Sequence, residues 1–473
     1  MSLQLSTNNR LQRSDYNYFV ERPEGIVAYN ARTGHFALLT SDLAMRLQSD
    51  CSLADIEEVE SLVEMGFLHY GDERDHIGLD YTKASLSQKH LGLTIAPTMG
   101  CNYHCDYCYQ NEYRNSRIMS PDTQVATLRY IEWLVSQGKT SASCTWYGGE
   151  PLLAKSIVLN MAMHLNILME KYNVALDRMS MITNGSLLDS DTTSQLFDVG
   201  IRRVQVSFDS YYDDGKTKRG VVLANEEPSL ILSNVLAASR LLSVSIRINI
   251  SQDNESDLDR ILETLDFYNL KSFAYLARVS DEDGESNYKT SPQGERQAYS
   301  GSLPIIQQGA QPLTRFRFAG IEDSKWSSMD DTVAMETMLG RLTPRRHFCS
   351  ATSGKLFVFD PDGNISRCWH SAGVPSEAMG NVNDGTPDAE SSDVAKVWRN
   401  YSPFFYPACA NCKVLPLCMG GCSHARVFMN ARKPPCETIK FQIQNTVERV
   451  GRALDLSAPL PQPNSKRTSN CDC

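Results

Sequence analysis

Three cysteines stand close together in the run PTMGCNYHCDYCYQNEY, which begins at Pro97. They are Cys101, Cys105 and Cys108, with the spacing Cx3CxxC. Thiolates on one short loop can each hold one iron of a 4Fe–4S cubane, which leaves the fourth iron without a protein ligand. An iron with an open position can bind a small chelating molecule and pass it an electron. A zinc knuckle completed by His104 is the alternative use of these cysteines.

A second group of seven cysteines lies in the last quarter of the chain. They are Cys349, Cys368, Cys409, Cys412, Cys418, Cys422 and Cys436. In a long chain without an apolar signal core, cysteines at short spacings bind metal or do redox chemistry more often than they form disulfides. The two groups therefore predict two regions of metal binding. Of the other cysteines, Cys51 and Cys144 stand alone, and Cys471 and Cys473 lie in the tail.

Six apolar runs predict the strands that must position the first cysteine group. They are LGLTI, ASCTWY, RMSMIT, RRVQVSF, VSIRINI and SFAYLA, between Leu91 and Ala277, with amphipathic segments between them. Strands that alternate with helices form parallel βαβ units with right-handed crossovers, so we expect an α/β sheet or a partial barrel. Such folds bind ligands at the carboxyl ends of their strands. Because Cys101 follows the first strand, we expect a site at that edge.

Composition and hydrophobic pattern also predict the boundaries of the regions along the chain. We expect an N-terminal module over 14–70, a polar linker over 71–90, the α/β region over 91–280, a bridging region over 281–346, the cysteine-rich region over 347–440, and a helix and tail over 441–473. In the N-terminal module, EGIVAYN and HFALLT predict a β-hairpin. The segments SDLAMRLQSD and LADIEEVESLVEMGFL predict helices, which gives a winged-helix-like pattern.

Composition excludes several classes of protein. The 473 residues are 41% hydrophobic and 22% charged, as in globular proteins. The net charge is −10 and there is no Lys/Arg block, so we expect no binding of nucleic acid or of an anionic membrane through bulk charge. We find no apolar run near the ~18 residues of a membrane helix, and no apolar signal core at the start. We therefore expect a soluble, cytoplasmic protein.

Cx3CxxC with Tyr107 before its third cysteine resembles the defining motif of the radical S-adenosylmethionine (radical SAM) superfamily. Tyr147-Gly148-Gly149-Glu150-Pro151 ends the second strand, where that superfamily has its GGEP motif. The resemblance implies a partial (β/α)6 barrel. It also implies that the reduced cluster cleaves S-adenosylmethionine to methionine and a 5′-deoxyadenosyl radical, which abstracts hydrogen from an unactivated C–H bond.

The same resemblance implies which side chains contact S-adenosylmethionine. Gly148 and Gly149 would let the backbone approach it closely, and Glu150 would accept a hydrogen bond from its ammonium group. The further contacts that we expect are Tyr107, Ser207, Asp209, Arg219, Asn249 and Leu276. Arg219 is expected near the methionine carboxylate, although Gly215-Lys216 replaces the usual His-Asp ahead of it, and Arg247 and Asn249 are its rivals. Leu276 is expected against the adenine or in the core.

The seven later cysteines resemble the SPASM extension, which carries two auxiliary 4Fe–4S clusters in peptide-modifying radical SAM enzymes. By position, Cys409, Cys412, Cys418 and Cys436 would hold the outer cluster, and Cys349, Cys368 and Cys422 the inner one. Three [4Fe–4S] clusters are thus implied. The inner cluster lacks a cysteine just upstream of Cys349, so it has an open iron or is completed by His347 or a tail cysteine. In sulfatase-maturing relatives, an aspartate that serves as the base occupies the position of Trp369, so this residue argues against sulfatase maturation.

The N-terminal module resembles the PqqD-like recognition element of enzymes that modify ribosomally synthesised peptides. In that element, a winged-helix-like domain binds the leader of a precursor peptide as an added strand. A structural cap is the alternative interpretation of the module. The resemblance implies three kinds of partner: a precursor peptide, an electron donor such as flavodoxin or ferredoxin, and an accessory protein as a further candidate.

The three resemblances together predict a radical SAM enzyme that modifies a precursor peptide. The modification is a crosslink, an epimerisation or the excision of a backbone fragment. Epimerisation would need a hydrogen donor, for which Cys144 and the tail pair Cys471 and Cys473 are candidates. A buried core cysteine is the alternative identity of Cys144. Maturation of a folded enzyme subunit is a second hypothesis, and a non-catalytic iron–sulfur or zinc-binding protein is a third.

Overall fold

The computed structural model of the 473-residue chain describes residues 10–23, 25–49, 59–87, 89–111, 113, 115–250, 254–270, 274–278, 342–385, 388–429, 436 and 439–453. Most of the expected bridging region over 281–346 lies outside these residues, as do Cys51, Cys471 and Cys473.

A nine-stranded sheet is the centre of the structure, in the order β13-β12-β9-β8-β7-β6-β14-β15-β16. Its first six strands confirm the six apolar runs and are parallel to their neighbours. They are β6 (His90–Ile95), β7 (Ser141–Trp146), β8 (Ala175–Thr183), β9 (Arg203–Phe208), β12 (Ser243–Ile250) and β13 (Ala274–Arg278). The expected α/β fold is therefore confirmed.

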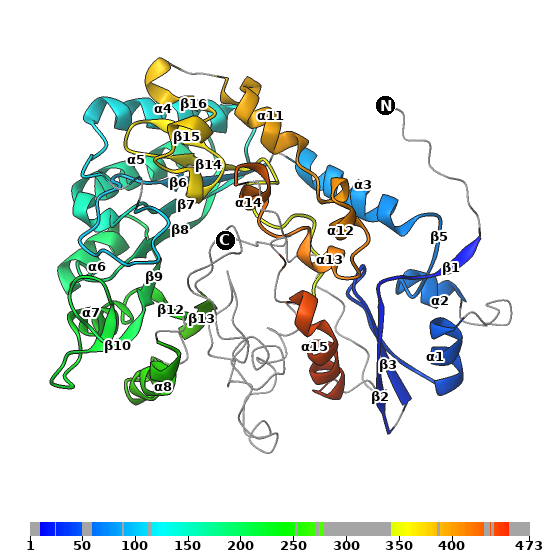
Figure 1. Ribbon diagram of the computed structural model, residues 1–473. Coiled ribbons are helices and arrows are strands. Elements are labelled where there is room, and N and C mark those ends of the chain that lie inside the picture. The colour runs from blue at the N-terminus through cyan, green and yellow to red at the C-terminus, as the bar shows by residue number, and fades with distance from the viewer. Residues whose placement is uncertain are drawn as a thin grey trace.

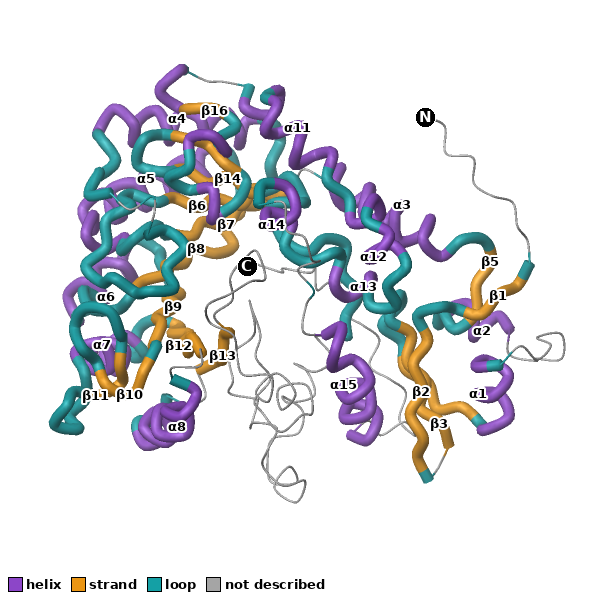
Figure 2. Tube along the Cα trace, in the orientation of Figure 1, coloured by secondary structure: helices purple, strands orange, loops and turns teal. Residues whose placement is uncertain are grey.

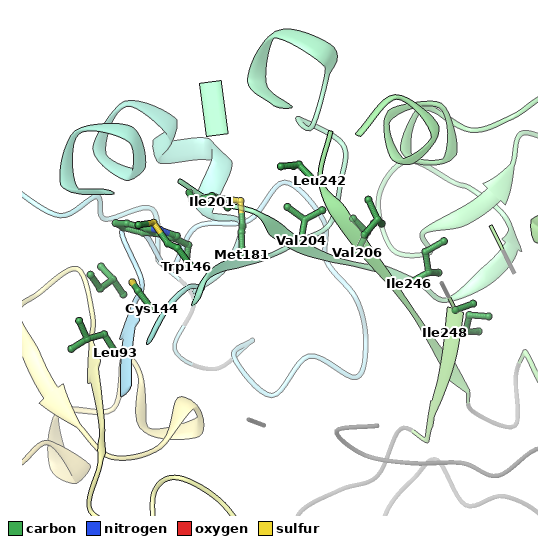
Figure 3. Close-up of a cluster of buried hydrophobic side chains, with 14 of the residues drawn as sticks. Leu93, Cys144, Trp146, Met181, Ile201, Val204, Val206, Leu242, Ile246 and Ile248 are labelled. Carbon is green, nitrogen blue, oxygen red and sulfur yellow. The ribbon is translucent and has the colours of Figure 1, made fainter. Parts of the chain in front are cut away.

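The convex face of this sheet is covered by helices (Figures 1 and 2). They are α4 (Pro121–Ser136), η1 (Pro151–Ala154), α5 (Lys155–Lys171), α6 (Ser190–Asp198), α7 (Leu230–Ala238) and α8 (Leu258–Phe267). Local sequence sets their starts: Ser120, Asp189 and Ser229 each accept a hydrogen bond from a backbone N–H of the following first turn. Alternate residues of the strands, such as Trp146, Met181 and Val206, pack beneath the helices (Figure 3).

The stretch Pro151–Lys171, which includes α5, is long and apolar enough to cross a membrane by length and composition alone. We expected no such run. Five of its α5 side chains, from Val158 to Met169, are buried. It occupies the place of a crossover helix between β7 and β8, so it is a core helix of the α/β region.

Three strands that the sequence did not predict extend the sheet beyond β6. They are β14 (Leu356–Phe359), β15 (Asn364–Ser366) and β16 (Gly380–Asn381). β14 pairs in parallel with β6, from Leu356 beside Gly92 to Phe359 beside Ile95. The cysteine-rich region is thus joined to the α/β region through shared backbone hydrogen bonds.

The N-terminal module lies on the opposite side of the molecule from the helices of the sheet (Figure 1). It contains β1 (Leu11–Arg13), β2 (Asn17–Arg22), β3 (Gly25–Asn30), β4 (Phe36–Leu39), α1 (Ser41–Gln48), α2 (Val59–Glu64) and β5 (Leu68–Tyr70). β3 and β4 form the expected hairpin, and β2 adds a third antiparallel strand.

The expected linker over 71–90 contains a helix, α3 (Glu73–Leu86). Asp72 accepts a hydrogen bond from the backbone N–H of Arg74 and so caps its start. Ile77, Tyr81 and Ala84 fall at helical spacing and pack inward. These few apolar residues in a polar segment explain why its composition alone suggested only a connection.

The cysteine-rich region continues from the sheet in short helices. They are α11 (Asp393–Asn400), α12 (Pro407–Ala410), α13 (Leu415–Cys418) and α14 (Ser423–Val427), with α15 (Ile439–Ala453) at the end of the described chain. α15 covers the outer edge of β2, where Gln444 Nε2 donates to the carbonyl of Phe19 and Arg22 donates to the carbonyl of Gly451.

Candidate functional site

The first cysteine loop starts directly beyond the carboxyl end of β6, as expected. Cys105 is buried, and Cys101 and Cys108 are half-buried. Burial raises the pKa of Cys105 to about 11, and the two other thiols of the loop are near enough to contribute to that increase. The loop thus places the three predicted ligands near one another.

The positions of the side chains around the cysteine loop bear on the zinc alternative. Within the described part of the chain, no three His, Cys, Asp or Glu side chains converge closely enough to hold one ion. A zinc knuckle completed by His104 would need such a convergence. A cubane takes each thiolate on a different iron, so its cysteines need not meet at one point.

The GGEP turn, Gly148 to Pro151, is hydrogen-bonded to the backbone of the cysteine loop. The N–H of Gly149 donates to the carbonyl of Thr98 at 3.1 Å, and the N–H of Glu150 donates to the carbonyl of Gly100 at 2.8 Å. A Cβ on Gly148 would lie 2.3 Å from the Thr98 oxygen, and one on Gly149 would lie 2.2 Å from the Gly100 oxygen. The close approach that requires these two glycines is therefore to the backbone of the cysteine loop.

Glu150 is completely buried and already has donors. Its carboxylate accepts hydrogen bonds from Thr183 Oγ1 at 2.8 Å and from the backbone N–H groups of Asn184 and Leu152 at 2.7 and 3.0 Å. Burial raises its pKa, although these hydrogen bonds oppose the shift. Glu150 thus links the end of β8 to the turn after β7 by hydrogen bonds, a role that the sequence did not reveal. Its contact with the ammonium group of a ligand stays a prediction.

Four of the predicted cofactor residues meet in one buried network beside Cys105. Asp209, just after β9, accepts from Arg219 Nε at 2.6 Å and Nη2 at 3.0 Å, and from Asn249 Nδ2 at 2.9 Å. The hydroxyl of Tyr107 also donates to Asp209, and Asn249 Nδ2 lies 2.8 Å from that hydroxyl. The cysteine loop, β9, the start of β11 (Gly220–Val222) and β12 thereby converge.

The charges of this network are balanced within the protein. Burial lowers the pKa of Arg219, but the carboxylate of Asp209 and Tyr107 raise it more, so the net shift is well above the usual value. Burial raises the pKa of Tyr107, which remains a neutral hydroxyl. Arg219 is thus a fixed cation whose bidentate partner is Asp209.

Arg219 and Arg247, the two arginines considered as donors to the carboxylate of S-adenosylmethionine, differ in their partners. It lies on β12 beside Ser207 of β9, and its Nε donates to Asn249 Oδ1 at 2.8 Å. Ser207 is buried on the same side of the sheet. Arg219 has two donors engaged with one carboxylate, whereas Arg247 has a single neutral partner among the described residues. Leu276, on the sixth parallel strand β13, is in register with Ile248, and its side chain lies outside the described part of the chain.

Aromatic rings from the cysteine-rich region close over the cysteine loop. Tyr109 stacks on His370 with ring centres 4.0 Å apart, and Tyr147 stacks on Trp369 at 4.9 Å. The hydroxyls of Tyr109 and Tyr147 are in contact, and burial raises the pKa of Tyr147 to about 12. Trp369 Nε1 donates to Thr94 Oγ1 of β6 at 2.8 Å. Beside burial, Cys108 and Cys368 both contribute to the raised pKa of Tyr147, so these rings lie close to both cysteines.

The sequence missed this aromatic wall, although a signal was present. Tyr109 directly follows Cys108, Tyr147 directly precedes the GGEP glycines, and Trp369 directly follows Cys368. The sequence shows that each of three separate motifs has an aromatic neighbour, and the structure shows that these neighbours contact one another or His370. Burial lowers the pKa of His370 to about 3, and the neighbouring His424 adds to this shift, so the imidazole in the wall is neutral.

The outer group of later cysteines is brought together by α12, α13 and the start of α15. Burial raises the pKa of Cys409, and Cys436 and Cys412 are near enough to affect it. Cys418 is buried at the end of α13. Arg426 Nη2 donates to Cys409 Sγ at 3.6 Å, and Lys440 Nζ donates to Cys436 Sγ at 3.4 Å.

The inner group is less completely defined. Cys349 Sγ lies 4.0 Å from the hydroxyl of Ser423, which follows Cys422 in the chain. Cys368 lies after β15 and affects the pKa of Tyr147 across the aromatic wall. The imidazole of His347 makes a tilted contact with the ring of Tyr81, with ring centres 4.5 Å apart, and its Nδ1 is buried without a hydrogen-bond partner. A cysteine as the fourth ligand is not found among the described residues near Cys349.

Cys144 is a core residue, so its candidate role as a hydrogen donor is not supported. It is 1% exposed and lies on the helix-covered face of β7, near Leu93 and Trp146 (Figure 3). Its neighbour Thr145 faces the other way and contacts Ser180 on the concave face. Strand alternation therefore turns Cys144 away from the cysteine loop.

A groove of 670 Å³ in the N-terminal module runs between the β2–β3 turn and α1. Its walls include Arg22, Ile26, Ala44 and the exposed side chain of Met45. Because α15 covers the outer edge of β2, the sheet edge that the described structure leaves unpaired is β4. The groove and this edge are the features of the module that could receive a peptide.

Comparison with known proteins agrees with this arrangement. Residues 95–265 match the Radical SAM superfamily. The chain is 24% identical over 197 residues to GTP 3′,8-cyclase of Staphylococcus aureus, and the match covers 40% of this chain. The chain spans about half the length of such curated relatives, 54% in this case.

The fold is also similar to solved structures. The structure of anSMEcpe with bound AdoMet and the Cp18Cys peptide is 16% identical, with a TM-score of 0.54 over 77% of this chain and 100% of that one. Streptococcus suis SuiB bound to the precursor peptide SuiA is 16% identical, with a TM-score of 0.43 over 90% of this chain and 98% of that one.

Proposed function

Residues 95–265 form a radical SAM domain, and we propose that this chain uses it to modify a ribosomally synthesised precursor peptide. The observation that carries the proposal is the meeting of the cysteine loop, the GGEP turn and the ends of β9 and β12 at one edge of the sheet. When bound there, an iron–sulfur cluster and S-adenosylmethionine supply a radical that removes hydrogen from an unactivated carbon.

The chain's own residues have distinct tasks in this proposal. Cys101, Cys105 and Cys108 hold the cluster, and the GGEP turn fixes their loop. Ser207, Arg247 and Asn249 line the concave edge where S-adenosylmethionine would bind, with Arg247 as the donor to its carboxylate. The Asp209–Arg219 pair positions Tyr107 and Asn249 rather than binding the ligand.

A peptide substrate is supported by the N-terminal module. Its groove and the unpaired edge of β4 suit an added strand, which is how leader peptides are held by PqqD-like elements. The structure of anSMEcpe, which shares the fold, was solved with a bound peptide. A folded enzyme subunit as substrate is the second possibility.

The experiment is anaerobic incubation of the reconstituted protein with S-adenosylmethionine, a reductant and a candidate precursor peptide encoded beside the gene. We expect 5′-deoxyadenosine and a change in peptide mass. Both should be lost when Cys101, Cys105 and Cys108 are replaced by alanine. The matched control is Cys144→Ala, which removes a core thiol outside the site and should retain turnover.

The mass change distinguishes the reactions. A loss of about 2 Da means a crosslink or other oxidation, deuterium uptake from heavy water means epimerisation, and a large loss means excision. Turnover with GTP in place of the peptide would instead favour the activity of the sequence relatives. Absence of 5′-deoxyadenosine from fully loaded protein would refute the radical chemistry itself.

A further inference from the structure

The inner group of later cysteines supplies three thiolates, from Cys349, Cys368 and Cys422. A cubane has four irons, so full ligation by the protein needs one further donor. The described residues near Cys349 include no fourth cysteine. An imidazole nitrogen replaces a cysteine on cluster iron in some iron–sulfur proteins. Histidines beside the inner group are therefore candidates for the fourth donor.

Three histidines each lie two residues from an inner-group cysteine in the sequence. They are His347, His370 and His424. His424 already uses Nε2, which lies 2.8 Å from a carboxylate oxygen of Glu377, and His370 stacks on Tyr109 in the aromatic wall. Among these three, His347 is the one with a ring nitrogen that is buried and has no hydrogen-bond partner in the described structure. That nitrogen is Nδ1.

The contacts of the other ring nitrogen of His347 show which of the two carries the hydrogen. Nε2 lies 3.4 Å from Oγ of Ser85, and the hydroxyl of Ser85 donates to the carbonyl of Tyr81 at 3.0 Å. Because this bond uses the hydroxyl proton, Nε2 is the donor to Ser85. Nδ1 then has a lone pair without a donor, and the lone pair of a neutral imidazole is a metal ligand.

His347 lies within reach of the inner group. It precedes Cys349 by two residues, so their Cα atoms are at most about 7 Å apart. Tyr81 contacts the His347 ring and, beside burial, Cys349 contributes to the raised pKa of Tyr81. The hydroxyl of Ser423, which directly follows Cys422, lies 4.0 Å from Cys349 Sγ. The imidazole, Cys349 and the loop that carries Cys422 thus occupy one region.

The neighbours of the His347 ring do not satisfy Nδ1. The hydroxyl of Tyr81 donates to the carbonyl of Tyr401 at 3.0 Å instead. Burial lowers the pKa of His347 most, and the nearby cations Lys355 and Arg346 lower it further, yet neither donates to Nδ1. A buried acceptor without a donor costs free energy, and a bond to iron would remove that cost.

We propose that Nδ1 of His347 is the fourth protein ligand of the inner auxiliary cluster. Ser85 holds the ring by accepting from Nε2, the kind of outer hydrogen bond that metal-binding histidines usually make. The inference rests on the auxiliary clusters that the seven-cysteine pattern implies, and it does not depend on which peptide is modified. An inner cluster with four protein ligands has no open iron for substrate, so its task would be electron transfer.

The experiment is pulsed EPR on the reduced, reconstituted full-length protein. Cys101, Cys105 and Cys108 are replaced by alanine so that the first cluster does not contribute, and the histidines are labelled with the heavy nitrogen isotope. A ligating imidazole nitrogen couples to the cluster spin more strongly than a backbone amide that is hydrogen-bonded to sulfur. We expect a strong nitrogen coupling that changes on histidine labelling.

Matched variants assign this coupling to one histidine. His347→Gln should lose it, whereas His370→Gln and His424→Gln, which change the two other histidines beside inner-group cysteines, should retain it. Ser85→Ala removes the outer hydrogen bond and should also retain the coupling. A chelator should remove iron from Ser85→Ala about tenfold more readily than from the parent protein, as expected for the loss of a partner of a ligating histidine.

The outcomes separate this inference from the proposed function. No histidine coupling in protein with full auxiliary iron would overturn the inference, and so would a coupling that persists in His347→Gln. Iron analysis that shows no inner cluster would overturn it as well, whereas 5′-deoxyadenosine from protein with its first cluster intact would leave the radical chemistry standing. If His347→Gln fails to fold, His370→Gln and His424→Gln still decide, since the loss of the coupling in either would refute the assignment.

Discussion

Replacing Gly149 by alanine tests whether the GGEP turn supports the cysteine loop by direct contact. The backbone of Gly149 is not in the left-handed region, so alanine fits its conformation there. The added Cβ would lie 2.2 Å from the Gly100 oxygen, 2.6 Å from the Gly100 carbonyl carbon and 2.6 Å from the Met99 oxygen. All three are backbone atoms and cannot rotate away. The whole cost therefore comes from displacing the cysteine loop.

The size of the effect follows from those distances. Ordinary contacts of a Cβ begin at 3.4 Å, so the loop must move by about 1 Å. Overpacking of this kind costs about 1–3 kcal/mol, and backbone atoms on several sides place Gly149→Ala near the upper end, about 3 kcal/mol. Because Gly100 precedes Cys101, the same movement should displace the first cluster ligand.

Two measurements on the purified protein check this. Urea unfolding of the apo protein should show the loss of about 3 kcal/mol. Iron analysis and the EPR signal that changes on adding S-adenosylmethionine should show loss of the first cluster. The matched control is Gly92→Ala on β6, whose added Cβ would meet Leu356 at an ordinary 3.4 Å. If Gly149→Ala equals Gly92→Ala in both measurements, the turn does not support the loop by contact.

Three further predictions concern the polar groups around the site. Asp209→Asn should destabilise the protein by about 3–5 kcal/mol in urea unfolding, because it leaves the buried Arg219 cation without its partner, and the double variant with Arg219→Met should recover most of that loss. Burial raises the pKa of Glu150 in the folded protein, so the stability that its protonated form contributes is present below the unfolded-state pKa near 4.5 and is lost as pH rises through the folded-state pKa. The free energy of unfolding of the wild type relative to Glu150→Gln should therefore fall as pH rises from 4 to 7. A difference between the two proteins that is constant with pH would contradict this. A double-mutant cycle of Trp369→Phe and Thr94→Val should give a coupling energy of about 1 kcal/mol for their hydrogen bond, whereas additive effects would mean that stacking alone holds the indole.

Local patterns in the sequence were enough to predict the centre of the fold. Short apolar runs that alternate with amphipathic segments predict parallel strands joined by helices, and β6, β7, β8, β9, β12 and β13 are such strands. Because parallel strands present their carboxyl ends at one edge, the position of Cys101 after β6 also located the site. This information is local, so one sequence sufficed for it.

What the sequence could not supply depends on contacts between distant segments. β14 joins β6 from a place in the chain more than 260 residues later, and nothing in LFVF specifies that partner. The pairing of Arg219 with Asp209 could likewise not be predicted, since residue type indicated a donor for a carboxylate but not which carboxylate. Residue types and their spacing predict what chemistry a side chain can do, whereas its partner depends on which distant segments the fold brings together.

The way in which the N-terminal module is attached affects how a peptide would reach the site. The Tyr18 hydroxyl donates to the carbonyl of Lys413 at 3.1 Å, so the module touches the loop that carries Cys412. Arg74 of the adjoining helix α3 donates to Asn411 of the same loop. Gln444 and Arg22 join it to α15 as well. A module on a free tether would raise only the local concentration of a bound leader. One that is fixed at two places holds the leader at a defined distance from the cysteine loop, so the number of residues between leader and modified position would be set by the structure.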